Sequence, residues 1–434
     1  MIYSIFNKLN KIKKFPFFFL SPLIYAIGNA SLQITIASNY TKSRGKVLII
    51  LKVKLLKRIL NYSICNNSLF HDLIFDKKKN LKYYFIANIA SYFLDIEFIF
   101  KRSFVLFFRK YFNIKFKEET IFPMIGINYI FGDSAIDHKK IDYKDIKPFY
   151  FYPNQIDIKE QQKIYCKKKL KEFGLDETEK LVCLHVRDGN FKNDENRKNY
   201  FNSGNYRNSD INNYIESINF LINQGYYVIR MGDSSSKKIN FNHKKFLDYS
   251  KSNIKEDIMD LYLIKKCAFY IGTQSGIIDI AYMFNKPVFT TNMCELFACL
   301  PRKKIDRGIF KKIYYGDGQN CTDIQTFAAL PFKYHDPQVE IMDMDLKFEE
   351  NSSEEIYEGT VEFLECLNKK KNLSNLQIQF NNFLKKKYME LFNQRNIDGH
   401  RVIDQQDCLW FVRIFKSCKG AFCNSYLKKN IKTL

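Results

Sequence analysis

Residues 268–292 constrain the fold more than any other stretch, because they read as strand, tight turn, helix and second strand within 25 residues. The first four residues are apolar, as in a buried parallel strand. Gly272 and Gly276 then mark a turn where the backbone bends sharply or approaches a ligand. Apolar residues at helical spacing follow until Pro287 ends the helix. The pattern predicts a βαβ unit, with Ser275 as the N-cap residue of its helix.

Two interpretations of this turn stay open. In the first, it is a solvated connection in an ordinary α/β domain. In the second, N–H groups at the helix start and the positive end of the helix dipole bind a diphosphate. The residues that would hold the diphosphate are Thr273, Gln274, Ser275 and Gly276.

A second apolar run, LVCLHVRD at 181–188, favours phosphate binding. Strand periodicity places Cys183, His185 and Arg187 on one face. A parallel sheet covered on both faces has no room for unpaired charge, so His185 and Arg187 belong at the carboxyl end of this strand, where α/β folds bind ligands. The planar guanidinium of Arg187 matches two phosphate oxygens at once, which makes it the primary candidate.

The surrounding sequence repeats this alternation of strands and helices. Strands are predicted at 181–188, 226–233, 246–250, 268–271 and 287–291, with helices at 158–174, at 210–223 and after a capping box of Asn253 and Glu256. The segment YYVIRMGD adds Arg230, Gly232 and Asp233 to the candidate ligand-binding residues. The fold class is therefore α/β, with a doubly wound parallel sheet.

A length of 434 residues predicts two α/β domains and additional helices. We assign them to 1–150, 151–365 and a helical extension at 366–434. The apolar stretch at 15–27 reads either as a signal peptide or interfacial anchor, or as structure. Prolines interrupt it and it is too short to span a bilayer, which favours a strand at 20–27, a turn at Gly28, a helix at 30–40 and a strand at 46–53.

The formal net charge of +23 is typical of proteins that bind nucleic acid or anionic membranes. Lys, Asn, Ile, Phe and Tyr are abundant throughout, however, as a codon bias would produce. Without a basic helix, zinc spacing or RNP-like motif we predict no specific nucleic-acid binding, and keep peripheral contact with an acidic membrane surface as a hypothesis. The eleven cysteines form no CxxC pair, which indicates reduced thiols in a cytosolic protein.

Residues 342–348 alternate apolar and polar side chains, which predicts a strand with one solvated face. Asp343 and Asp345 superficially match the DxD metal motif of some sugar transferases, but the alternation accounts for both. We therefore predict no metal site. Ser352 and Glu355 then have capping-box spacing at the start of a helix.

Several motifs in this order resemble a bacterial family of predicted glycosyltransferases, related at a distance to fucosyltransferase-like enzymes. The resemblance covers about residues 180–365 and rests on HVRD at 185–188, YRNSD at 206–210, YYVIRMGD at 226–233, DIMDLYL at 257–263 and SGIIDIA at 275–281. It implies the two-domain GT-B fold, in which the second domain binds a nucleotide sugar and the first presents the acceptor.

The resemblance also implies roles for individual residues. His185 and Arg187 match an HxR signature that contacts donor ribose or phosphate, and Ser275 and Gly276 match a pyrophosphate-binding turn. Asp279 stands where heptosyltransferase-like proteins often have a histidine, which leaves the donor open, although the HxR motif hints at a guanine nucleotide. The implied activity is transfer of a sugar from a nucleotide-diphosphate donor to a glycan, lipid or polysaccharide acceptor. We expect this reaction in the cytoplasm or at the inner membrane face, and we expect no cofactor.

Direct displacement at the anomeric carbon requires a general base for the acceptor hydroxyl. We expect the first domain to supply it, with Asp133, Asp137 and His138 as candidates. Asp188 is a further candidate, although a structural hydrogen bond to the turn also explains it. A catalytically silent nucleotide- or glycan-binding protein of the same fold is the alternative function.

Overall fold

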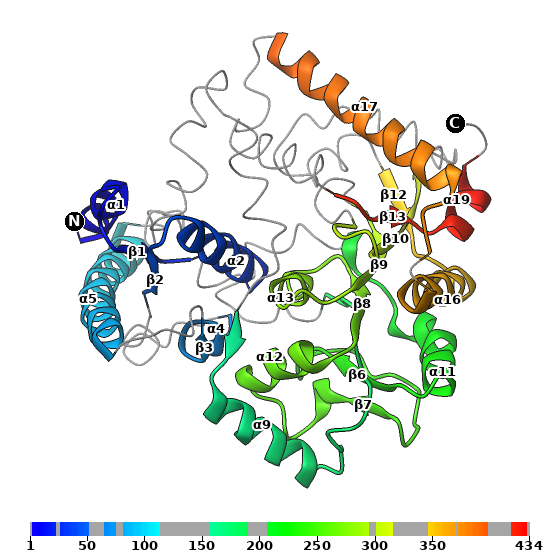
Figure 1. Cartoon of the computed structure of the whole chain (residues 1–434), viewed down its shortest axis with the longest axis horizontal. Helices are drawn as coiled ribbons and strands as arrows, with labels where there is room; N and C mark the ends of the chain where they lie inside the picture. Colours follow the sequence, from blue (N-terminus) through cyan, green and yellow to red (C-terminus); the bar gives the residue numbers. More distant parts are fainter. Residues whose placement is uncertain are drawn as a thin grey trace. The chain divides into compact units, whose positions relative to one another are not determined.

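The computed structural model describes residues 2–22, 27–51, 65–74, 81–112, 156–189, 206–294, 301–315, 346–369, 371–397 and 418–431. The chain forms two compact units (Figure 1). Unit 1 comprises Met1–Lys169, Glu256–Tyr262 and Met283–Asn285, and unit 2 comprises Leu170–Lys255, Leu263–Tyr282 and Lys286–Leu434.

Unit 1 begins with a helix and a parallel βαβ element. These are α1 (Ile2–Lys11), β1 (Phe17–Leu20), α2 (Ile27–Ser43) and β2 (Val47–Ile50). β1 and β2 pair in parallel. The buried side-chain amide of Asn10 donates to the Phe19 carbonyl and accepts from the Phe19 N–H, each at 2.8 Å.

The predicted helix at 30–40 is confirmed, and the strand predicted at 46–53 is confirmed over Val47–Ile50, but the strand predicted at 20–27 is wrong. The strand is the aromatic run that ends at Leu20, and Gly28 lies inside α2 rather than in a turn. Pro22 has no N–H for a strand ladder, so the chain leaves the sheet there.

Unit 1 also contains α4 (Ser68–His71), β3 (Leu73–Ile74), α5 (Leu81–Phe112), β4 (Asp157–Ile158) and α9 (Glu160–Glu172), whose last three residues belong to unit 2. α9 confirms the helix predicted at 158–174. The capping box of Asn253 and Glu256 is wrong: the helix begins at Asp257, and the Glu256 carboxylate instead accepts hydrogen bonds from Tyr165 and Lys169.

Unit 2 is built on a seven-stranded sheet in which every neighbouring pair is parallel, in the order β13-β10-β9-β8-β5-β6-β7. Its strands are β5 (Leu181–His185), β6 (Tyr227–Met231), β7 (Phe246–Asp248), β8 (Phe269–Thr273), β9 (Val288–Met293), β10 (Arg307–Phe310) and β13 (Ala421–Phe422). The predicted parallel α/β sheet is confirmed. The sequence did not predict β10 or β13, and β13 brings the last part of the chain into the sheet.

The helical segments of this part of the chain follow the predicted alternation. They are η5 (Ile211–Tyr214), α11 (Ile215–Asn223), η6 (Tyr249–Lys251), α12 (Asp257–Lys266), α13 (Ile278–Met283), α16 (Ser353–Lys369), α17 (Asn375–Ile397) and α19 (Asn424–Asn430). A separate antiparallel pair joins β11 (Lys312–Tyr315) to β12 (Leu346–Glu349).

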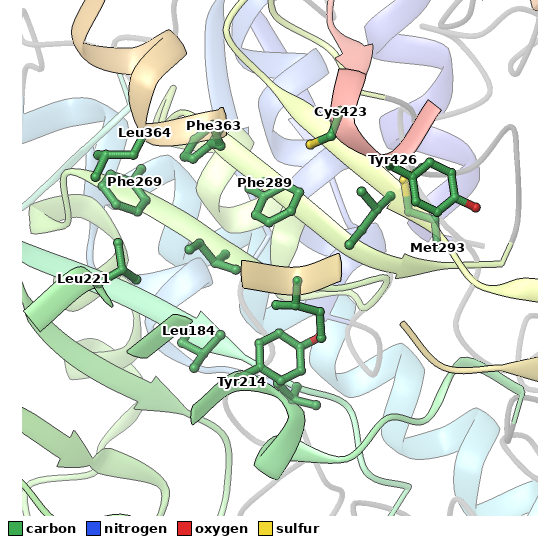
Figure 2. Packing of buried hydrophobic residues seen from close by; sticks show 14 of the residues in the cluster. Leu184, Tyr214, Leu221, Phe269, Phe289, Met293, Phe363, Leu364, Cys423 and Tyr426 are labelled. Atoms are coloured by element: carbon green, nitrogen blue, oxygen red, sulfur yellow. The ribbon is translucent and has the colours of Figure 1, made fainter. Parts of the chain in front are cut away.

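The core of unit 2 lies between the sheet and the helices α11 and α16 (Figure 2). Phe269 and Phe289 pack from the strands against Phe363 of α16, whose ring centroid lies 5.4 Å from that of Phe269 and 5.8 Å from that of Phe289. A side chain at Gly359 would meet the Phe289 ring at 2.5 Å, so this glycine lets α16 approach the sheet.

The capping box predicted for Ser352 and Glu355 is confirmed. The Glu355 N–H donates to Ser352 Oγ at 3.2 Å, and the Ser352 N–H donates to Glu355 Oε2 at 3.0 Å. α16 therefore begins at Ser353, as its sequence indicates. Across the described ranges, we find no helix with the length and apolarity needed to cross a bilayer.

Candidate anion-binding site

The strand order of unit 2 reverses between β5 and β8. From β5 the chain adds β6 and β7 on one side, then returns to the other side of β5 as β8. His185 pairs with Gly272, so the two strands end at the same level. Ligands of doubly wound sheets bind where two neighbouring connections diverge in this way, outside the carboxyl ends of the strands.

Polar residues at the ends of β5 and β8, and in the turns directly after them, contact one another at this edge. The Arg187 N–H donates to Thr273 Oγ1 at 2.9 Å, and the Ser275 hydroxyl lies 3.1 Å from His185 Nδ1. Gly272 permits this approach, because a Cβ there would lie 2.5 Å from the His185 carbonyl oxygen. The structure therefore brings together the two segments that the sequence singled out independently.

His185 is held as a neutral imidazole. Burial lowers its pKa to about 4, against the opposing influence of the nearby carboxylates of Asp188 and Asp233, while Arg230 and Arg187 lower it further. Its Nδ1 is bonded to Ser275, and its Nε2 has no hydrogen-bond partner within the described ranges. If the serine donates to Nδ1, then Nε2 carries the proton and can donate to a ligand oxygen.

Two cations meet at this edge around Asn208. Arg187 Nη1 donates to Asn208 Oδ1, and Lys311 Nζ donates to the Asn208 carbonyl at 2.5 Å. Lys311 is only 4% exposed; burial lowers its pKa, opposed by Cys294 and Glu350, with Arg187 adding to the decrease.

Sequence reasoning missed Lys311. It directly follows the buried run Gly308–Phe310 at the end of β10, much as Arg187 follows the apolar run of β5. A charged residue after a buried strand was therefore the available signal.

Asp188 and the turn after β6 are neighbours. Asp188 Oδ2 accepts the Lys237 N–H at 2.6 Å, a hydrogen bond to the segment after β6. Asp233 Oδ1 accepts the Ser235 N–H at 2.7 Å. Gly232 has a φ of 153°, and a Cβ there would lie 2.6 Å from Ser236 Oγ. Gly232 and Asp233 thus shape a tight turn that Asp188 holds beside β5.

Arg230 and Gln274 bind groups of the protein itself. Arg230 is 1% exposed and its Nη1 donates to Asp248 Oδ2 at 3.0 Å, while its Nε and Nη2 have no hydrogen-bond partner within the described residues. The buried Gln274 accepts the Cys294 N–H through Oε1 at 3.1 Å, which ties the end of β8 to the end of β9.

The helix after the turn differs from the prediction. α13 begins at Ile278, and the Ser275 hydroxyl bonds His185, so Ser275 and Gly276 lie in the turn before the helix and the predicted N-cap is wrong. Asp279 accepts from Arg302 Nη2 at 2.8 Å; burial raises its pKa, opposed by Arg302. Asp279 is therefore part of a buried ion pair.

The predicted general-base candidates Asp133, Asp137 and His138 lie outside the described residues, as do Asp343 and Asp345. Within the residues the structure does describe, no group of three or more His, Cys, Asp or Glu side chains is placed to hold a metal ion.

Comparison with known proteins gives weak likenesses only. No protein-family model matches the chain, and no curated protein does. Among solved structures, it is similar to a glycosyl transferase family 9 protein from Veillonella parvula DSM 2008, with 12% identity and a TM-score of 0.25 over 32% of this chain and 37% of that one. The chain thus covers little more than a third of that protein's length.

It is also similar to ADP-heptose lps heptosyltransferase II from E. coli, with 12% identity and a TM-score of 0.34 over 63% of this chain and 83% of that one. These values assign no family.

Proposed function

We propose that this protein is a glycosyltransferase of the GT-B type that moves a sugar from a nucleotide-diphosphate donor to a glycan or lipid-linked acceptor. One observation carries the proposal: the reversal of strand order places His185, Arg187, Thr273 and Ser275 together at the carboxyl edge of β5 and β8. The motifs that resemble glycosyltransferases contribute His185, Arg187 and Ser275, which links the site to the reaction.

The charges at this edge suit a diphosphate. Arg187 offers a forked guanidinium for two phosphate oxygens, and Lys311 adds a second positive charge beside the same asparagine. A ligand that replaced Asn208 as the partner of both cations would gain two charge-assisted interactions. The imidazole of His185 is uncharged near neutral pH, and its Nε2 can donate a hydrogen bond to a phosphate or ribose oxygen.

In the proposed reaction, the acceptor hydroxyl attacks the anomeric carbon while the bond from that carbon to the diphosphate oxygen breaks. Negative charge grows on the departing diphosphate, and Arg187 and Lys311 stabilise it there, so the proposal needs no metal ion. The general base belongs to the acceptor-side domain, for which Asp133, Asp137 and His138 remain the candidates. The donor is a GDP-linked sugar in the first instance, because of the HxR motif.

Titration of the purified protein with GDP, UDP and ADP, and with their sugars, tests the proposal. We expect binding of one diphosphate, and sugar transfer or slow donor hydrolysis in the presence of EDTA. Lys311→Met should weaken diphosphate binding, whereas Lys238→Met, a change at an exposed lysine, should not. Absence of binding to all three diphosphates would refute the site, and binding without turnover would identify the catalytically silent protein instead.

A further inference from the structure

The helix α5 exposes an apolar stripe along most of its length. Large apolar side chains recur at intervals of three and four residues, which places them on one face. Its exposed members are Phe85, Ile89, Tyr92, Phe93, Ile96, Phe100, Phe104, Phe107 and Tyr111. Phe85 is 68% exposed and Phe100 is 73% exposed. From Phe85 to Tyr111 the stripe is about 40 Å long at 1.5 Å per residue.

The opposite face of α5 is already used in the fold of unit 1. Leu94, Phe98 and Val105 on that face are buried, and α5 packs against α1 and β2 (Figure 1). The exposed stripe is therefore a second apolar face on a helix whose first face holds it in place. Isolated exposed apolar residues are common on proteins, but a continuous stripe of this length marks an interaction surface.

Positive charge gathers on α1, which packs against α5, and on the turn that follows α1. Lys8 and Lys11 of α1 and the following Lys13 and Lys14 are all exposed. Lys46 at the start of β2 donates to the Ile12 carbonyl at 3.0 Å, which joins the turn before β2 to the end of α1. Ile5 of α1 and Ile12, which directly follows this helix, are also exposed.

The excess positive charge of the chain is concentrated in the first 71 residues of the sequence. The first acidic residue is Asp72, and the 71 residues before it contain eleven Lys and Arg. The net charge of the chain is 69 minus 46, or +23, so these residues supply 11 of the 23 excess charges. A uniform codon bias does not produce this asymmetry, which instead fits recognition of an anionic surface.

We propose that the apolar stripe of α5 and the basic segment of α1 and its following turn bind an anionic phospholipid membrane, with α5 lying in the plane of the interface. Aromatic side chains suit the boundary between head groups and acyl chains, and lysines beside them attract acidic lipids. A second copy of the chain would present the same positive charge and be repelled. The inference rests on unit 1 alone and does not depend on the proposed transferase activity.

Vesicle flotation tests the inference with full-length protein. We expect flotation with vesicles of phosphatidylcholine and phosphatidylglycerol, and little with phosphatidylcholine alone. Raising the salt from about 0.1 M to about 1 M should weaken it, because the Debye length falls from about 10 Å to about 3 Å. The double substitution Lys13→Gln and Lys14→Gln should weaken binding about fivefold for each lysine removed.

Substitutions in the stripe separate insertion from charge attraction. Phe100→Asp with Phe107→Asp should weaken vesicle binding at least about tenfold per residue. The matched control, Ile164→Asp with Ile378→Asp, changes two exposed apolar residues outside the stripe and should leave vesicle binding unchanged, with the melting temperatures of both variants compared to confirm folding.

Failure of the unmodified protein to float with anionic vesicles would overturn the inference. A stable dimer in light scattering would also overturn it, if the stripe substitutions convert the dimer to monomer and the control pair does not. In that case a second copy of the chain covers this face. A protein that floats as expected but neither binds nor turns over any nucleotide sugar would refute the proposed function and leave the membrane surface standing.

Discussion

Replacement of Arg187 by alanine is the sharpest test of the site. In the structure its guanidinium donates to Asn208 and its side chain is only partly buried, so the substitution removes this hydrogen bond from a partly exposed position. We expect a loss of about 1 kcal/mol in the free energy of unfolding. The fold should therefore survive.

The expected effect on ligand binding is larger. Two charge-assisted hydrogen bonds to a diphosphate contribute about 1.5 kcal/mol or more each, so their loss should weaken diphosphate binding by more than about 100-fold. Arg187→Lys keeps the charge but loses the fork, and should weaken binding by about tenfold. Sugar transfer should be abolished in the alanine variant.

Isothermal titration with GDP, UDP and ADP measures these effects, and thermal melting monitors the fold. Arg44→Ala is the matched control, since Arg44 is an exposed arginine of unit 1 that stacks on Tyr40. A dissociation constant that changes by less than about twofold in a folded Arg187→Ala variant would refute the assignment of this residue to the donor phosphate.

Three further predictions concern stability and the geometry of the site. His185 has a pKa of about 4 in the folded protein against 6.5 ordinarily, so the unfolded chain binds its proton at a higher pH than the folded chain does. The free energy of unfolding should therefore keep its full value above pH 6.5 and fall by about 3 kcal/mol as the pH drops to 4. In urea unfolding from pH 4 to 7, the free energy of unfolding of His185→Gln should vary less with pH than that of the unmodified protein. Identical pH dependences for the two proteins would contradict this account. Gly272→Ala should separate β5 from β8, lower stability by about 1–3 kcal/mol and weaken diphosphate binding, as calorimetry and titration would show. Ser352→Ala should cost about 1 kcal/mol of stability in urea unfolding, and Ser352→Asp much less, because aspartate retains the N-cap acceptor.

Much of the sheet could be predicted because its signals are local. The apolar runs of β5, β6, β8 and β9 and the helical periodicities between them are properties of short segments, as is the capping box of Ser352 and Glu355. The predictions that failed depended on the hydrogen-bond partner of a polar side chain. Ser275 bonds a histidine from another strand rather than its own helix, and Glu256 bonds α9 rather than Asn253.

The sequence by itself determined that the chain contains α/β units, and that His185 and Arg187 lie at a strand end rather than in the sheet interior, because unpaired polar groups are costly to bury between covering helices. Only the tertiary structure decided that β8 lies beside β5, which brings Thr273 and Ser275 to them. It alone placed Lys311 beside Arg187, and Arg230 against Asp248. Strand order and side-chain partnership depend on contacts between residues distant in the chain, and the pattern within one segment does not encode them.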